Sequence, residues 1–257
     1  FLYMANEIKS LNDIKVPKRF WSFYRRLGDE LKHSNRFTIS PDLHQTIEEY
    51  ISFHVSRKIF HLNAGQRYYR ARINSIDQGV SYSKGEMGAP PKGDASSGRI
   101  NPEGIPYLYL ANCEETAIAE VRPWTGALIS VATFELTRDV EIVSLKHEKI
   151  LNHKDYELKD IIRDMLNSIP INQYYFSSPA HNNDKLSYLP SQYLAELFKT
   201  RGLDGLEYDS VLNIDGVNLA LFDTSAAECI HIEQYRVNRI EYDSSLVSNK
   251  SKAESVT

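Results

Sequence analysis

Residues 106–123 read PYLYLANCEETAIAEVRP, and this stretch decides the class of fold. Its first third alternates aromatic and apolar residues and predicts a short strand that ends at Ala111. A helix is expected next, because Asn112 is followed three residues later by Glu115, as in a capping box. Pro123 ends that helix, since proline cannot continue its backbone hydrogen bonds. A strand that leads directly into a helix indicates that both kinds of element share one core.

Further strands are expected on both sides of this stretch. They are Gln66–Ile73, Ala127–Leu136, Val140–Ser144, Leu206–Val211, Val217–Phe222, Cys229–Ile232 and Val237–Tyr242. A second helix is expected at Tyr188–Thr200. Because few helices separate these strands, the sequence predicts an α+β fold with a mixed or largely antiparallel sheet. Residues 79–106 are rich in glycine and proline and predict a long irregular loop, a kind of segment that is usually functional or disordered.

The N-terminal part of the chain has a different, helical pattern. Residues 17–33 have the apolar spacing of an amphipathic helix. Another helix is expected from Ser40 to Ile59, with the serine hydroxyl as its cap and the following proline in its first turn. We therefore predict a helical extension at residues 1–63, a main domain at 64–243 and a polar, disordered tail at 244–257.

The composition of the 257-residue chain limits its partners and location. It contains 30 basic and 34 acidic residues, a net charge of −4, and 42% hydrophobic residues. A balance so close to neutral gives no large electrostatic footprint, so nucleic acid is not expected as a partner. No apolar run is long enough for a membrane span, and no signal peptide is visible, so we expect a cytoplasmic protein. Cys113 and Cys229 do not form a metal-binding spacing.

Common catalytic signatures do not occur in the sequence. It has no phosphate-binding P-loop, no G-x-S-x-G elbow and no H-E-x-x-H, and its eight histidines are scattered, so no metal site is expected. What remains is a set of polar residues in apolar surroundings, each of which alone would be an ordinary surface, core or turn residue. These residues are Arg70, Arg99, Tyr109, Glu120, Ser210 and Asn218.

The order and spacing of these residues resemble the RES family, which is named for an Arg, a Glu and a Ser. No single piece of the pattern is specific, but seven pieces in this order are. They are Arg70, the loop GRINPEG at residues 98–104, Leu108-Tyr109, Ala117 with Glu120, Pro190-Ser191-Gln192, Asp204-Gly205, and Ser210. Ile100 departs from the pattern, since the family often has Trp there, and the packing of the loop is expected to differ.

The resemblance implies both a fold and a function. Proteins of the RES family resemble ADP-ribosyltransferases in fold, so the resemblance implies an ADP-ribosyltransferase-like core with the helical unit 1–63 added to it. Members of the family deplete NAD⁺ as toxins, usually neutralised by a partner antitoxin. The chain is therefore expected to bind NAD⁺ as its substrate and to cleave the nicotinamide–ribose bond. No metal is expected, because nicotinamide is already a cationic leaving group.

The resemblance also implies roles for individual residues. Arg70 and Arg99 would hold the NAD⁺ phosphates, because a planar guanidinium donates paired hydrogen bonds to phosphate. Tyr109 would stack on nicotinamide or position its ribose, and Asn218 would also contact NAD⁺. The catalytic set would be Glu120 with Arg70 and Ser210. Glu120 would bind the ribose 2′-hydroxyl and stabilise the developing positive charge, and Ser210 would orient Glu120 or the ribose.

Several alternatives stay open at the level of sequence. The cleavage could be hydrolysis or phosphorolysis, in a toxin or a defence effector. The same residues would serve an ADP-ribosyltransferase that modifies a macromolecule, or a non-catalytic module that binds NAD⁺ or a partner. The helical extension could cover the site, mediate self-association into a homo-oligomer, or replace the surface of a separate antitoxin. Arg122 and Glu207 are interpreted as ordinary surface charges.

Overall fold

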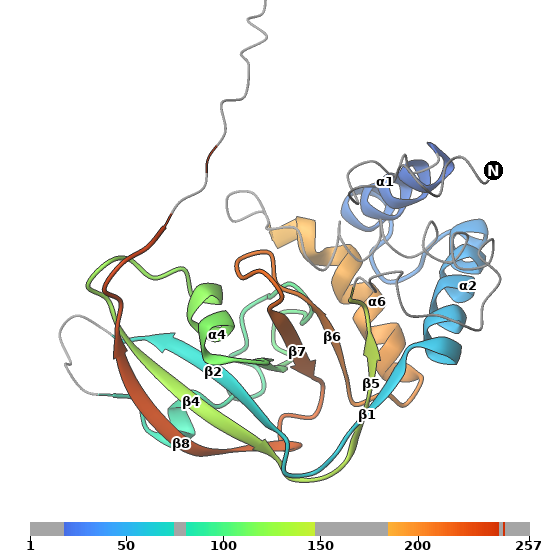
Figure 1. Ribbon diagram of the computed structural model, residues 1–257. Coiled ribbons are helices and arrows are strands. Elements are labelled where there is room, and N and C mark those ends of the chain that lie inside the picture. Colours follow the sequence, from blue (N-terminus) through green and yellow to red (C-terminus); the bar gives the residue numbers. More distant parts are fainter. Residues whose placement is uncertain (1–17, 75–80, 147–184, 242–243, 245–257) are drawn as a thin grey trace, which may run out of the picture.

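One mixed sheet organises the protein. The computed structural model describes residues 18–74, 81–146, 185–241 and 244. Eight strands in these residues form the sheet, in the order β1-β5-β6-β7-β3-β2-β4-β8 (Figure 1). Their bounds are β1 Ile59–Leu62, β2 Arg67–Ile73, β3 Leu108–Ala111, β4 Leu128–Leu136, β5 Val140–Ser144, β6 Gly205–Asp209, β7 Val217–Leu221 and β8 Ala227–Arg236. Only β5 and β6 pair in parallel among these strands, so the predicted mixed, largely antiparallel sheet is confirmed.

The described helices cover the sheet in two places. They are α1 Lys18–His33, α2 Pro41–Arg57, α3 Lys84–Met87, α4 Glu114–Glu120 and α6 Leu189–Thr200, with a 3₁₀ turn at Lys185–Tyr188. Figure 1 shows α1, α2 and α6 together at the end of the sheet that contains β1, β5 and β6. The short helix α4 packs instead on β2, β3 and β4. None of these described helices is both long enough and apolar enough to cross a bilayer.

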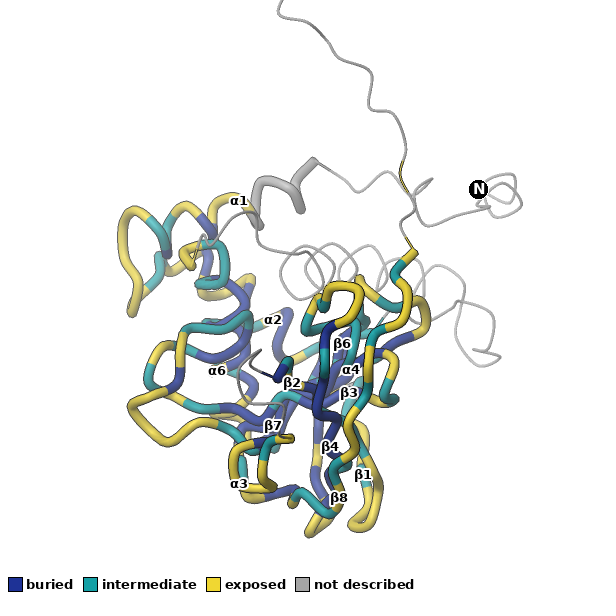
Figure 2. The backbone as a smooth tube through the Cα atoms, turned by 90° about the vertical axis from the view of Figure 1, so that its left-hand side faces the viewer, coloured by how far each residue is buried: buried dark blue, intermediate teal, exposed yellow. Residues whose placement is uncertain are grey.

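The N-terminal helices share a hydrophobic core with the rest of the protein. Leu31 of α1 and Ile47 of α2 belong to the same buried cluster as Phe198 of α6 and Leu206 of β6. Figure 2 shows the buried positions concentrated in the central strands and the exposed ones in the connecting loops. The division at residue 63 stays a prediction, but no gap in the packing accompanies it, because one apolar cluster spans both sides.

Both N-terminal helices begin where the sequence indicates, but two details differ. The predicted cap of α2 is wrong, because the Ser40 hydroxyl donates to Oε2 of Glu30 at 2.8 Å and not to the helix backbone. The backbone N–H of Ser40 also donates to Glu30, so this carboxylate joins the end of α1 to the start of α2. The second difference is that α2 ends at Arg57. Ile59 is not helical and begins β1, where it pairs with Val143 of β5.

The C-terminal strand is longer than expected. The sequence indicates strands at Cys229–Ile232 and Val237–Tyr242, whereas the structure has one strand, β8, which ends at Arg236. Its length follows that of β4, which pairs with it along the whole strand around a bulge at Thr133 and Phe134. The described residues after Arg236 form no strand. The expected tail from 244 onward, and most of the region 145–187, lie outside the described residues.

The antiparallel pairing of β6 with β7 requires glycine at position 205. A β-carbon there would overlap the backbone oxygen of Ala220 and lie 3.3 Å from the Cα of Leu221. We expect Gly205→Ala to lower the free energy of unfolding by about 2–3 kcal/mol, because a backbone overlap can be relieved only by separating the strands. Urea denaturation measures this change.

Gly85→Ala is the matched control for that experiment. A β-carbon on Gly85 in α3 meets nothing within 4 Å, so the free energy of unfolding is expected to stay the same or to rise slightly. Equal urea midpoints for the two variants would show that a β-carbon at position 205 does not destabilise the protein, and would contradict the prediction.

Candidate functional site

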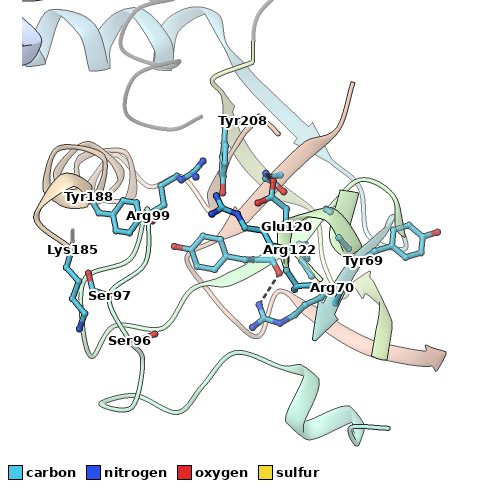
Figure 3. Close-up of a pocket in the computed structure, with 17 residues that line it drawn as sticks. Tyr69, Arg70, Ser96, Ser97, Arg99, Glu120, Arg122, Lys185, Tyr188 and Tyr208 are labelled. Atoms are coloured by element: carbon cyan, nitrogen blue, oxygen red, sulfur yellow. Dashed lines mark hydrogen bonds between the residues drawn. The ribbon is translucent and has the colours of Figure 1, made fainter. Parts of the chain in front are cut away.

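A cavity of about 960 Å³ contains most of the residues singled out in the sequence. Strands β2, β3, β6 and β7, helix α4, the loop before β3 and the turn before α6 all contribute to its walls. The predicted residues that line it are Arg70, Arg99, Tyr109, Glu120 and Asn218. Figure 3 shows Arg99, Tyr188 and Lys185 grouped on one side and Glu120, Arg122 and Arg70 on the other. Positions more than a hundred residues apart in the chain therefore meet at one site.

Among the described residues, Glu120 is the one acidic side chain in the lining, and it is held through a single oxygen. It lies at the C-terminal end of α4, where its Oε1 accepts hydrogen bonds from Oγ of Ser210 and from Nδ2 of Asn218, both at 2.7 Å. Among the described residues, no donor lies within hydrogen-bond distance of its Oε2. The carboxylate is therefore fixed in orientation while one oxygen keeps its full capacity to accept.

Ser210 reaches the site only through Glu120. It follows the last residue of β6 and is not part of the cavity wall. Its Oγ also accepts hydrogen bonds from the backbone N–H groups of Leu212, at 3.1 Å, and Asn213, at 3.2 Å. Of the two roles considered for Ser210, this geometry favours orienting Glu120 over contacting the ribose.

The short helix that carries Glu120, α4, is not stabilised by the predicted capping box. Its N-cap residue is Cys113, without a side-chain cap, and the expected cap by Asn112 is wrong. The side chain of Asn112 is used elsewhere, since its Oδ1 accepts from the backbone N–H of Val217 at 2.9 Å. Asn213 donates from Nδ2 to Oγ1 of the buried Thr116 at 2.8 Å. These bonds tie α4 to β7 and to the loop after β6, so the carboxylate has a rigid support.

Arg70 lines the cavity as a cation that has no counter-ion among the described residues. Its Nη1 donates to the backbone oxygen of Tyr109 at 3.1 Å, the bond drawn in Figure 3. Its Nε is buried without a hydrogen-bond partner, and no acidic side chain of the described residues pairs with it. Burial, assisted by the neighbouring Arg72, lowers the pKa of Arg70 to about 10. A partly buried cation with an unsatisfied donor is unfavourable, so an anion bound here would be favoured.

The loop that carries Arg99 is organised around the hydroxyl of Tyr109. This hydroxyl donates to Oδ1 of Asn101 at 2.7 Å and accepts from the backbone N–H groups of Ile100 and Asn101, each at 3.1 Å. Burial raises the pKa of Tyr109 to about 12. Only glycine fits at position 98, because a β-carbon would overlap the Asn101 side chain and lie 2.9 Å from the tyrosine oxygen. The Tyr109 hydroxyl is thus committed to the loop, while its ring still faces the cavity.

Helix α6 holds the same loop from the other side. Nε2 of Gln192 donates to the backbone oxygens of Gly98, at 2.7 Å, and Asn101, at 3.1 Å. The hydroxyl of Ser191 donates to the backbone oxygen of Arg99. These two side chains belong to the Pro-Ser-Gln segment of the sequence pattern, but the sequence indicated no role for them. Their function is visible only once the loop and the helix are seen side by side.

Arg122 corrects one expectation from the sequence. It was interpreted as an ordinary surface charge; it is indeed exposed, but it also lines the cavity that contains Glu120. Its backbone has a φ of +47°, a left-handed conformation that is uncommon for residues other than glycine. Glu207, in contrast, lies outside the cavity wall and forms an ion pair with Lys146 at 2.9 Å.

The lining is strongly cationic. Arg70, Arg99, Arg122 and Lys185 face one carboxylate, Glu120. The guanidinium carbon of Arg99 lies 5.9 Å from the centre of the Tyr208 ring, within cation–π range. Burial raises the pKa of Tyr208 far above its usual value. Ile100, at the position where Trp is frequent in the family, is fully buried in the core cluster with α6.

The Tyr109 hydroxyl provides a direct test of how the loop is held. Tyr109→Phe leaves the backbone N–H groups of Ile100 and Asn101 without their acceptor, so we expect the free energy of unfolding to fall by about 1–3 kcal/mol. Tyr69→Phe is the control, because Tyr69 also lines the cavity and its hydroxyl has no partner among the described residues. Thermal or urea denaturation compares the two variants, and equal losses would contradict the role assigned to Tyr109.

Comparison with known proteins finds a family whose model matches most of the chain. A family model described as the RES domain matches residues 67–243. Among solved structures, a chain of the M. tuberculosis MbcT–MbcA toxin–antitoxin complex is similar at 14% identity and a TM-score of 0.41. That similarity covers 75% of this chain and 93% of the other. A search of curated proteins finds no match.

Proposed function

The chain belongs to the RES-domain family, and from that premise we propose that it cleaves NAD⁺ at the bond between nicotinamide and ribose. In this reaction the C1′–N bond breaks and its electron pair neutralises the nicotinamide ring. Water then adds to C1′ and gives ADP-ribose and a proton, or phosphate adds and gives ADP-ribose 1-phosphate. The observation that carries the proposal is the cavity itself. Arg70 and Arg99 line it together with the carboxylate of Glu120, which is held through a single oxygen.

The cationic lining supports binding of a dinucleotide. The pyrophosphate of NAD⁺ carries two negative charges, and Arg70 is a partly buried cation that lacks a counter-ion among the described residues. Phosphate oxygens would satisfy its remaining donors with charge-assisted hydrogen bonds. Arg99 supplies a second guanidinium from the loop anchored by Tyr109. The cavity volume of about 960 Å³ lies within the usual range for small-molecule sites.

The orientation of Glu120 supports the chemical step. Its Oε2, without a donor among the described residues, can accept a hydrogen bond from a ribose hydroxyl. As the nicotinamide leaves, positive charge develops on the ribose, and a fixed carboxylate stabilises that charge without reorganising. Tyr109 offers its ring as a stacking surface, because its hydroxyl is already used in the loop.

The biological role proposed with this activity is that of a growth-inhibiting toxin or defence effector acting in the cytoplasm, where NAD⁺ is found. Loss of NAD⁺ would stop growth, so an antitoxin that binds this protein is the partner to look for. Self-association through the helical extension is a further proposal on partners. It is tested by the molar mass of the purified protein in solution.

Nicotinamide release from NAD⁺ tests the activity. The purified full-length protein is incubated with NAD⁺, with and without inorganic phosphate, and the products are separated by chromatography. Release that needs no phosphate, with ADP-ribose as product, indicates hydrolysis, and release that requires phosphate indicates phosphorolysis. If ADP-ribose stays on a macromolecule when lysate is added, the protein is a transferase. NAD⁺ binding without release would reject cleavage and support a binding module.

A further inference from the structure

The backbone at Asn218 is fixed from both sides. Asn218 lies in β7, which pairs with β3 on one side and β6 on the other, and its direct neighbours are Ala111 and Tyr208. Only 5% of the residue is exposed. Its Nδ2 donates to Oε1 of Glu120 at 2.7 Å. An amide placed so rigidly in the sheet centre can define where the carboxylate points.

The hydrogen bonds around Glu120 show the role of the Asn218 amide. Ser210 accepts two backbone N–H groups at its Oγ, so its only hydrogen is directed to Oε1 of Glu120. Oε1 therefore receives two donors, one from Ser210 and one from Asn218. This arrangement leaves Oε2 as the oxygen available to a ligand.

We propose that Asn218 is a positioning residue, which acts through Glu120 and does not itself hold NAD⁺. The inference rests on the proposed cleavage of NAD⁺ and differs from the contact with NAD⁺ expected from the sequence. Ser210 and Asn218 come from the ends of adjacent antiparallel strands and clamp the same oxygen from two directions. Losing either donor lets the carboxylate rotate, and Oε2 then no longer meets the ribose in the reactive geometry.

The first test separates positioning from binding. Asn218→Leu removes the donor and keeps a side chain of similar size. We expect kcat for nicotinamide release to fall about 100-fold, the scale of a small misplacement of a catalytic group, while KM for NAD⁺ stays the same. In a Glu120→Gln background the same substitution should change the rate by less than about twofold, because its effect passes through that carboxylate. A raised KM with unchanged kcat would overturn the inference.

The second test uses Asn218→Asp, which makes the donor depend on pH. When the new carboxyl is protonated it can donate to Oε1 of Glu120, and when it is ionised the two carboxylates repel each other. Activity should therefore be present at low pH and be lost as pH rises through the apparent pKa of the pair, a loss that wild type lacks. The other charged groups in the lining are arginines and a lysine, side-chain types that do not titrate between about pH 5 and about pH 9.

Asn112→Asp is the matched control for the pH experiment. It makes the same chemical change near the start of β7, outside the cavity wall, and an ionised carboxylate can still accept from the backbone N–H of Val217. Its profile should follow that of wild type, and a loss like that of Asn218→Asp would reject the inference. No nicotinamide from wild type would reject the proposed function as a whole. Release by wild type with an unchanged kcat in Asn218→Leu would reject only the role of Asn218.

Discussion

We expect the replacement of Glu120 with glutamine to lower the rate of nicotinamide release about 100- to 1,000-fold, the range found in other enzymes when one group that stabilises transition-state charge is removed. The amide keeps the size of the side chain, and its oxygen can still accept from Ser210 and Asn218 in place of Oε1. Its nitrogen then points into the cavity in place of Oε2. A neutral donor cannot accept the ribose hydroxyl or stabilise positive charge, so kcat should fall far more than KM changes.

Glu115→Gln is the control for this result. Glu115 lies on the same helix, α4, and is exposed outside the cavity wall, so its charge can be removed without touching the site. Nicotinamide release by this variant should match wild type within about twofold. If Glu120→Gln keeps the wild-type rate while its fold is unchanged, the carboxylate plays no part in cleavage and the proposed mechanism fails.

The second large effect is expected from Arg70→Met, which should move activity and stability in different directions. Loss of the guanidinium removes a charge-assisted bond to phosphate, worth about 1.5–3 kcal/mol, so kcat/KM for NAD⁺ should fall roughly 10- to 100-fold. The free energy of unfolding should stay the same or rise. The reason is that Arg70 is a cation whose buried Nε has no partner among the described residues, and an apolar side chain of similar length avoids that cost.

Arg67→Met tests whether this behaviour is specific to the cavity. Arg67 lies on the same strand, is exposed, and pairs with Glu135 at 3.1 Å. An exposed pair contributes little, so both kcat/KM and stability should change only slightly. A clear loss of stability in Arg70→Met, with NAD⁺ kinetics unchanged, would show that Arg70 supports the sheet and does not serve the ligand.

Much of the fold could be predicted because its signals are local. The apolar spacing of α1 and α2 and the apolar run along β4 depend on neighbours within a few residues. The end of α2 and the length of β8 could not be predicted in this way. Ile59 begins a strand because β5 offers it a partner, and β8 continues to Arg236 because β4 does. A partner strand far along the chain is invisible to a local pattern.

The site, too, has features that the sequence predicts and features that depend on contacts between distant residues. Arg70, Arg99 and Glu120 were predicted from their order in the sequence, and the structure brings them to one cavity. What could not be predicted is how they are supported, because those bonds join distant residues. Gln192 binds the backbone of Gly98, and Asn218 binds Glu120 across 98 positions of the chain. The place of Arg122 in the lining was missed because no sequence signal pointed to it.

The two ends of α6 link regions that look independent. Its first turn carries Ser191 and Gln192 to the Arg99 loop, and its last turn carries Phe198 into the cluster shared with α1 and α2. If expression of the protein arrests cells, survivors selected for spontaneous escape should carry changes in this helical layer as well as in the cavity. Such mutations would leave the catalytic residues unchanged. The positions of inactivating mutations would therefore extend well into the N-terminal part of the gene.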